Sequence, residues 1–246
     1  MFIKQLPVYL LSLIGSLYAA GGPPMITDDA QTPGNNNFEI NIAFEGDLRS
    51  NIQRYEFPII DINYGIGENI QLKIESPYVA LLGDRNIEAK GIGNTTVGMK
   101  WRFYENSANN LLISTYPQYI FTPVKESLHS GVAEINQALF LPIEISKKIE
   151  ELSVTGEFGY RAIKNSRNEM EYGVVVGYEI SEDLELLAEL HNTSYLSGGN
   201  MTIIANGGFT YKISPKYSLL FSVGRELISP EESKSTLLYA GLQLHY

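Results

Sequence analysis

A period-two alternation of apolar and polar side chains recurs along most of this chain, and it constrains the fold more than any other feature. It is clearest in segments 38–45, 71–75, 96–103, 171–180 and 184–191. In the earliest of these segments the apolar positions are Phe38, Ile40, Ile42 and Phe44. Because successive side chains of a β-strand point to opposite faces, each segment predicts a strand with one apolar and one polar face.

Extending this pattern along the chain gives about twelve strands of roughly ten residues each. We expect them near 37–46, 51–64, 69–79, 94–104, 111–122, 132–146, 152–163, 170–180, 184–195, 201–213, 217–226 and 236–246. Short links between these strands alternate with generally longer ones, as in outer-membrane barrels. The sequence therefore predicts an all-β fold, a transmembrane, antiparallel, up-and-down β-barrel of about 12 strands.

A soluble β-sandwich or a lipocalin-like barrel is the alternative, and in either of these the apolar face would point inward. The alternation alone does not separate these folds. Three features favour the membrane: glycine, small and charged residues crowd the polar face, Tyr and Phe lie near strand ends, and the C-terminus is aromatic.

The N-terminal residues indicate export. Lys4 precedes an apolar run from Leu6 to Leu17, and small residues follow, which is typical of a secretory signal peptide. We therefore divide the chain into a signal peptide (1–21), an extended leader (22–36) and a barrel (37–246), located in the outer membrane of a Gram-negative bacterium. No segment after Gly22 has the 18 or more consecutive apolar residues of a helical membrane span, and the chain contains no cysteine.

The last strand carries a short signature. Gly241, Leu244 and the terminal Tyr246 have the spacing of the signal that barrel-assembly machinery recognises, and the segment resembles the C-terminus of Gram-negative outer-membrane proteins generally. This resemblance implies that the machinery is a partner, along with outer-membrane lipids and lipopolysaccharide.

A narrower resemblance covers about a hundred residues after the signal peptide, in ordered pieces. The matching segments are 22–32 (GPPMITDDAQT), 63–66 (NYGI), 77–78 (PY) and 91–103 (GIGNTTVGMKWRF). They resemble the N-terminal half of the outer-membrane transporter family annotated with the meta-pathway of phenol degradation. What the resemblance implies is a single-chain barrel proposed to carry hydrophobic or aromatic compounds.

Charged side chains on the polar strand faces are the candidates for lining the lumen. They are Glu39, Glu45, Arg54, Asp61, Lys73, Glu75, Lys100, Arg102, Glu134, Glu144, Glu157, Arg161, Glu171, Glu179, Glu185 and Glu189. One interpretation is a ladder of ion pairs that stiffens the barrel. The other is an acidic lumen that attracts cations or zwitterions, and both can hold together.

The leader is a candidate plug. Its residues Thr27, Asp28 and Asp29 would meet basic side chains of the lumen, or the two carboxylates would simply cap a turn. The chain carries a formal net charge of −10, which argues against nucleic acid as a partner.

Catalysis is not predicted. His191, Ser194 and Glu189 could be drawn as a nucleophile group, but their order on one strand puts Ser194 on the face opposite the other two. Without cysteine and with scattered histidines we expect no metal site and no cofactor. The loop acids Glu231 and Glu232 fit a solvated loop better than a calcium or lipopolysaccharide bridge.

These observations predict a passive channel or transporter for small molecules, with a charged lumen and an unknown substrate. The alternative is a structural or adhesion barrel whose lumen is closed. A lipid-modifying barrel enzyme is the least favoured hypothesis.

Overall fold

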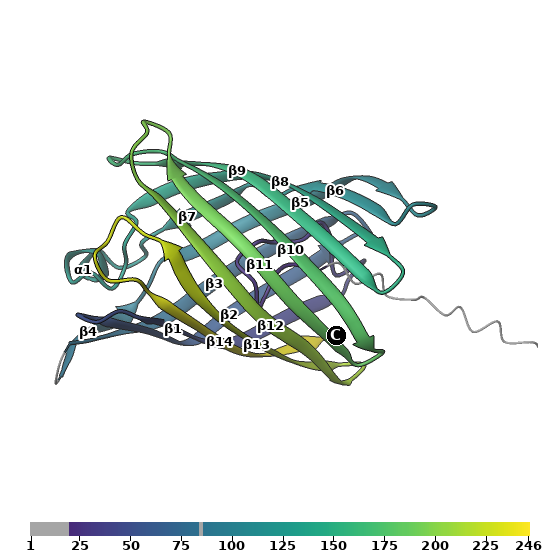
Figure 1. Ribbon diagram of the computed structural model, residues 1–246, viewed down its shortest axis with the longest axis horizontal. Coiled ribbons are helices and arrows are strands. Elements are labelled where there is room, and N and C mark those ends of the chain that lie inside the picture. The colour runs from purple at the N-terminus through teal and green to yellow at the C-terminus, as the bar shows by residue number, and fades with distance from the viewer. Residues whose placement is uncertain (1–19, 84–85) are drawn as a thin grey trace, which may run out of the picture.

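The computed structural model describes residues 20–83 and 86–246, so the predicted signal peptide lies almost wholly outside the described residues. The chain forms a closed antiparallel β-barrel of twelve spanning strands (Figure 1). Its strands are β1 (Phe38–Leu48), β2 (Gln53–Ile66), β3 (Ile70–Leu82), β4 (Ile87–Ile92), β5 (Thr95–Asn106), β6 (Leu111–Thr115), β7 (Gln118–Phe121), β8 (Gln137–Ile149), β9 (Leu152–Ile163), β10 (Glu169–Ser181), β11 (Leu184–Tyr195), β12 (Met201–Ser214), β13 (Tyr217–Ile228) and β14 (Thr236–His245). The predicted fold class and strand number are confirmed.

Two of the twelve spanning strands are interrupted. β4 and β5 both pair with β3 and so form successive parts of one strand, broken at Gly93 and Asn94. β6 and β7 likewise both pair with β5 and β8, with a break at Tyr116 and Pro117. Proline has no backbone N–H for a ladder hydrogen bond, which accounts for the second break.

The barrel closes where its first and last strands meet. β1 pairs with β14 from Glu39–His245 to Leu48–Thr236. Beyond the strand end, the N–H of Phe38 donates to the carbonyl of Tyr246 at 2.6 Å, and the reverse bond measures 3.0 Å. The short turns lie at this end of the barrel, while the longer loops and the helix α1 (Lys125–His129) lie at the other (Figure 1).

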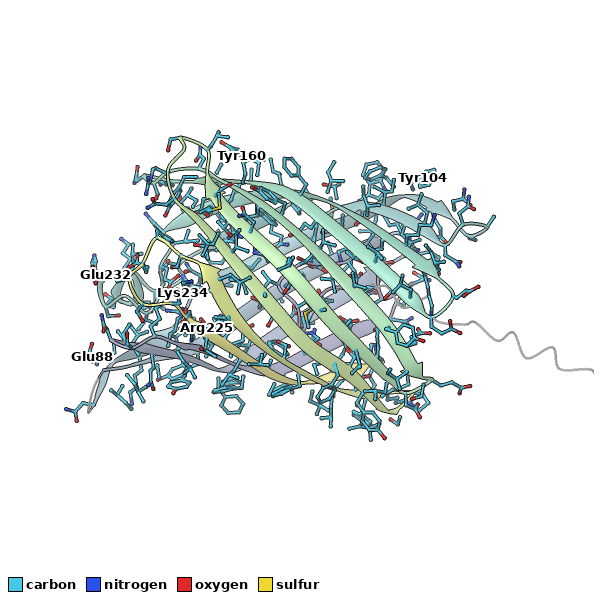
Figure 2. The ribbon with its side chains drawn as sticks, in the orientation of Figure 1. Glu88, Tyr104, Tyr160, Arg225, Glu232 and Lys234 are labelled. Atoms are coloured by element: carbon cyan, nitrogen blue, oxygen red, sulfur yellow. The ribbon has the colours of Figure 1, made fainter. Side chains whose placement is uncertain are left out.

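The apolar strand faces point outward and the polar faces point inward (Figure 2). The side chains of Phe158 and Leu190 are each 58% exposed on the outside, whereas Glu144 and Thr155 on the inside are fully buried. This is the arrangement of a membrane barrel, and it is opposite to that of a soluble barrel.

The loop before β8 differs from the predicted strand 132–146. The side-chain oxygen of Asn94 accepts the N–H groups of Glu134 and Ile135 at 2.9 and 3.1 Å. These N–H groups are therefore not available for strand pairing, and β8 begins only at Gln137. The prediction that Glu134 lines the lumen from a strand is wrong, because its side chain is 69% exposed in this loop.

None of the described helices has the length and apolar character needed to cross a membrane.

Candidate functional site

The leader lies inside the barrel. Its residues 22–27 form a compact turn, in which the N–H of Gly22 donates to the carbonyl of Thr27 at 2.8 Å. Met25 and Ala20 pack against Val175 on the inner wall. The leader then returns towards the short-turn end, where the N–H of Gly65 donates to the carbonyl of Asn37 at 2.9 Å. The segment thus occupies the lumen as a loop whose two ends lie at the short-turn end of the barrel.

Backbone groups of the leader are bound by side chains of the wall. Glu189 accepts the N–H of Ile26 at 3.1 Å and that of Thr27 at 2.6 Å. Asn206 donates to the same carboxylate at 3.1 Å. The hydroxyl of Ser222 donates to the carbonyl of Pro24 at 2.8 Å. The docked turn therefore has wall partners for both its donors and its acceptors.

Lys100 is the cation that binds the leader. Its ammonium donates to Asp28 Oδ1 at 3.0 Å and to the backbone carbonyl of Asp29, and it lies 4.0 Å from Glu144 Oε2. The Lys100 side chain is only 2% exposed. The structure thus brings together the leader candidates Asp28 and Asp29 and the lumen candidates Lys100 and Glu144.

The two leader carboxylates also cap turns and differ in their pKa values. Asp28 accepts the N–H of Asp29, and Asp29 accepts the N–H of Gln31, at 2.8 and 2.6 Å. Burial raises the pKa of Asp28, but the charges of Lys100 and Lys73, together with hydrogen bonds from Lys100 and from the backbone of Asp29, outweigh burial and place the pKa of Asp28 below its ordinary value. Burial raises the pKa of Asp29 to about 6 against the opposing charge of Lys100.

Glycines on the barrel wall leave room for the leader, because they have no side chain. A Cβ atom built on Gly173 would lie 1.8 Å from Thr27 Oγ1, and one built on Gly65 would lie 1.8 Å from the carbonyl oxygen of Gly34. Atoms cannot approach so closely, so any other residue at these positions would displace the leader. The wall is therefore complementary in shape to the docked segment.

The remaining lumen candidates fall into three groups. Three basic side chains form inward ion pairs: Arg54 with Glu56 at 2.7 Å, Lys73 with Glu75 at 2.8 Å, and Arg161 with Glu171. Asp61 lies 3.5 Å from Lys73. Carboxylates without an ion pair in the described part of the chain are Glu39, Glu45, Glu157, Glu185 and Glu189, whereas Glu179 pairs with Lys148. Arg102 instead lies near the short-turn end, where it pairs with Glu105 at 3.1 Å.

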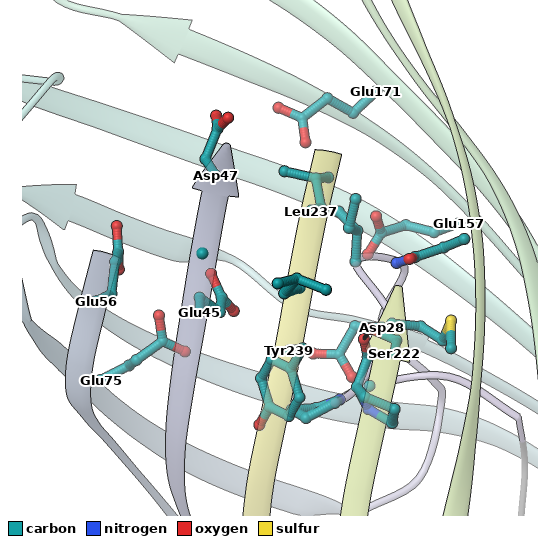
Figure 3. Close-up of a pocket in the computed structure, with 18 of the residues that line it drawn as sticks. Asp28, Glu45, Asp47, Glu56, Glu75, Glu157, Glu171, Ser222, Leu237 and Tyr239 are labelled. Atoms are coloured by element: carbon teal, nitrogen blue, oxygen red, sulfur yellow. Dashed lines mark hydrogen bonds between the residues drawn. The ribbon is translucent and has the colours of Figure 1, made fainter. Parts of the chain in front are cut away.

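An acidic cavity of about 340 Å³ lies beside the leader (Figure 3). Its charged lining consists of the acids Asp28, Glu45, Asp47, Glu56, Glu75, Glu157 and Glu171 and the bases Arg54, Lys73 and Arg161. Apolar lining comes from residues that include Met25, Ile26, Phe140, Leu237 and Tyr239. The cavity is therefore a charged chamber with apolar patches.

Sequence reasoning missed two of these acids as lumen residues. Glu56 lies beside a register shift between β2 and its neighbours, at Phe57 and Pro58, which interrupts the period-two pattern used to assign faces. Asp47 lies at the end of β1, beyond the predicted boundary at residue 46. A search for strand irregularities at proline would have found Glu56.

The hypothetical nucleophile group does not form. His191 is buried on the inner face, whereas the hydroxyl of Ser194, on the other face, is directed to the carbonyl of Met170 at 3.5 Å. Within the described ranges, no three His, Asp or Glu side chains are placed to bind a metal ion together.

Comparisons with known proteins support the architecture. No protein-family model and no curated protein matches the chain. The solved structure described as the COG4313 outer membrane channel from Pseudomonas putida F1 matches with a TM-score of 0.65 and 12% identity, over 89% of this chain and 98% of that chain. Two structures described as porins also match over 83% of this chain and 98% of theirs: NanC (TM-score 0.58, 7% identity) and KdgM (0.54, 14%).

The fold is that of outer-membrane barrel channels. At these identities the likeness shows the fold alone. The resemblance to the phenol-degradation transporter family has no support from a family model.

Proposed function

We propose that this protein is a passive outer-membrane channel for small molecules, whose lumen is narrowed by the docked leader. The observation that carries the proposal is the closed barrel with an apolar outer face and a polar interior that contains a charged cavity. An apolar outer face suits the lipid core of a membrane, and a polar interior suits the passage of solutes through it. The apolar cavity lining and the family resemblance extend the proposal to hydrophobic or aromatic solutes.

Assembly and lipid contacts belong to the same proposal. Gly241, Leu244 and Tyr246 lie on or next to β14, the strand that closes the barrel, where barrel-assembly machinery would act on them. Outer-membrane lipids and lipopolysaccharide would contact the outward apolar faces.

A closed structural barrel is the second candidate function. The specific observation that favours it is the number of polar bonds between the leader and the wall, through Glu189, Lys100 and Ser222. A leader that never leaves would keep the lumen closed.

Single-channel recording separates these two candidates. The protein beginning at Gly22 is refolded, its barrel is verified by heat-dependent gel mobility, and it is inserted into planar bilayers beside a variant lacking residues 22–36. We expect discrete conductance steps, which are larger in the variant. A folded and inserted barrel that stays silent without its leader would refute the channel and support the structural role.

A further inference from the structure

We propose that the lumenal cavity binds small organic cations, amines with an apolar body, through the carboxylates of Glu45 and Glu157. This inference rests on the proposed channel function and specifies the chemical class of its solute. Three features of the cavity support it: its acids outnumber its bases, acids lie opposite each other on neighbouring strands, and its lining contains both charged and apolar side chains.

Each basic side chain of the cavity already contacts two carboxylates. Arg54 contacts Glu56 at 2.7 Å and Glu134 at 3.7 Å. Lys73 contacts Glu75 at 2.8 Å and Asp61 at 3.5 Å. Since each cation already serves two carboxylates, it has no strong attraction left for the remaining acids.

Arg161 follows the same pattern, with Glu171 and, at 3.9 Å, Glu169. Of the acids that remain, Asp28 pairs with Lys100 and Asp47 with Arg49. Glu45 and Glu157 are left as the two cavity carboxylates with no ion pair among the described residues.

Both unpaired carboxylates lie directly opposite another acid on the neighbouring strand. Glu45 of β1 is opposite Glu56 of β2, and Glu157 of β9 is opposite Glu144 of β8. Like charges in this arrangement repel each other and destabilise the sheet. A cation bound between the walls would relieve this repulsion, whereas an anion would increase it.

A buried acceptor without a partner lines the same cavity. The amide nitrogen of Asn206 donates to Glu189, but its side-chain oxygen has no hydrogen bond in the described part of the chain. Asn206 is 9% exposed, and its oxygen occupies the inward space over Gly224, 2.4 Å from where a Cβ would lie. An unused acceptor in a cavity that also contains carboxylates without an ion pair favours a ligand rich in N–H donors.

The apolar side chains of the cavity indicate that the ligand also has an apolar part. Met25, Phe140 and Tyr239 line the cavity along with the acids. The volume of about 340 Å³ lies at the small end of ligand pockets, which span roughly 300–1,000 Å³. A one-ring or short-chain ammonium ion would fill it, with its charge on the carboxylates and its body on these side chains.

The test compares four small probes by isothermal titration calorimetry. Benzylammonium, benzyl alcohol and benzoate share one ring and differ in charge, and methylammonium keeps the charge without the ring. Each is titrated into the refolded protein beginning at Gly22 in detergent micelles, and into empty micelles as a blank. We expect benzylammonium to bind most tightly, methylammonium weakly, and benzoate not at all. Benzyl alcohol or benzoate binding as well as benzylammonium would overturn the proposal.

Variants locate the site. We expect Glu45→Gln and Glu157→Gln each to weaken benzylammonium binding by about tenfold, the size expected on losing one charge-assisted contact. Glu150→Gln in an exposed turn between β8 and β9 is the matched control and should bind as the parent protein does. Equal affinity in all three variants would refute the assignment to Glu45 and Glu157.

Folding and channel function are read out separately. Heat-dependent gel mobility verifies that each variant is a barrel, and we expect Glu157→Gln to melt no lower than the parent protein because it removes repulsion with Glu144. Conductance in planar bilayers is measured on the same samples. A barrel that conducts without binding benzylammonium would refute only the solute class, and a barrel that binds without conducting would refute only the channel.

Discussion

Lys100 is the residue on which the charges of leader and wall converge. Its buried ammonium is surrounded by Asp28, by the carbonyl and carboxylate of Asp29, and by Glu144. Buried charged groups are stable only when they are paired with opposite charges. This one cation therefore allows the acidic leader to dock inside an acidic lumen.

Replacing Lys100 by Met should release the leader. The change leaves three buried carboxyl groups without a cation, a penalty of about 3–5 kcal/mol for a broken buried ion pair. Since the chain has no cysteine, Thr27→Cys provides a single reporter thiol at a fully buried position of the docked leader. We expect Lys100→Met to speed its reaction with a maleimide, and the exposed Lys125→Met to leave the rate unchanged. An unaltered rate in a correctly folded Lys100→Met barrel would contradict this role.

A substitution at Gly173 tests how closely the wall fits the leader, because it adds a single methyl group at their contact. We expect Gly173→Ala to expel the segment around Thr27, because the new methyl group would overlap Thr27 Oγ1. Hydrogen exchange measured by mass spectrometry should then be faster over residues 22–30. Gly156→Ala on the neighbouring strand is the control, because a Cβ there meets only a carbonyl oxygen at 4.0 Å. Equal protection in both variants would show that the leader adapts to the methyl group.

At the scale of elements, the positions of the strands can be predicted from the sequence, whereas the docking partners of the leader cannot. Period-two alternation predicts strands such as β10 and β11 to within a residue or two, because each strand meets lipid on one side and a polar lumen on the other. The docking of the leader depends on Glu189 and Lys100, which lie far away in sequence. Sequence could propose a plug with acidic contacts, but it could not identify the partners.

The same reasoning explains the candidate residues that the sequence misplaced or missed. Glu134 was assigned to a strand that is shortened by the hydrogen bonds of Asn94. Glu56 was missed because the register shifts at the adjacent Pro58. Both depend on interactions across strands, which an alternation within one strand does not encode.

Acidity should strengthen docking of the leader between pH 7.5 and 5. The pKa of Asp29 is about 6 when docked, above its ordinary value of 3.8, so the docked state binds more protons in this window and gains stability as the pH falls. The pKa of Asp28 is lowered, so its contribution is lost only below the ordinary value of 3.8. Maleimide labelling of Thr27→Cys, corrected for thiol ionisation, should slow on acidification. Asp29→Asn should reduce this dependence, and the same slope with and without Asp29 would contradict the assignment.

For the whole molecule, we expect the acidic interior within an apolar wall to determine which ions the proposed channel passes. Acids outnumber bases seven to three in the cavity lining, and a low-dielectric tube focuses the field of such an excess. Salt screens this field over about 10 Å at 0.1 M and about 3 Å at 1 M. We therefore expect a pore lacking residues 22–36 to be cation-selective in a potassium chloride gradient and to lose selectivity as the salt is raised.

Reversal potentials measure this selectivity directly, and charge-neutral variants identify its source. Glu45→Gln in that pore should move the reversal potential towards zero, because Glu45 projects into the cavity without a cationic partner among the described residues. Glu182→Gln, in an exposed turn outside the lumen, should not move it. Anion selectivity, or a potential that is independent of salt, would mean that the paired carboxylates stiffen the barrel without controlling passage. The ion-pair ladder would then be the whole role of the lumenal charge.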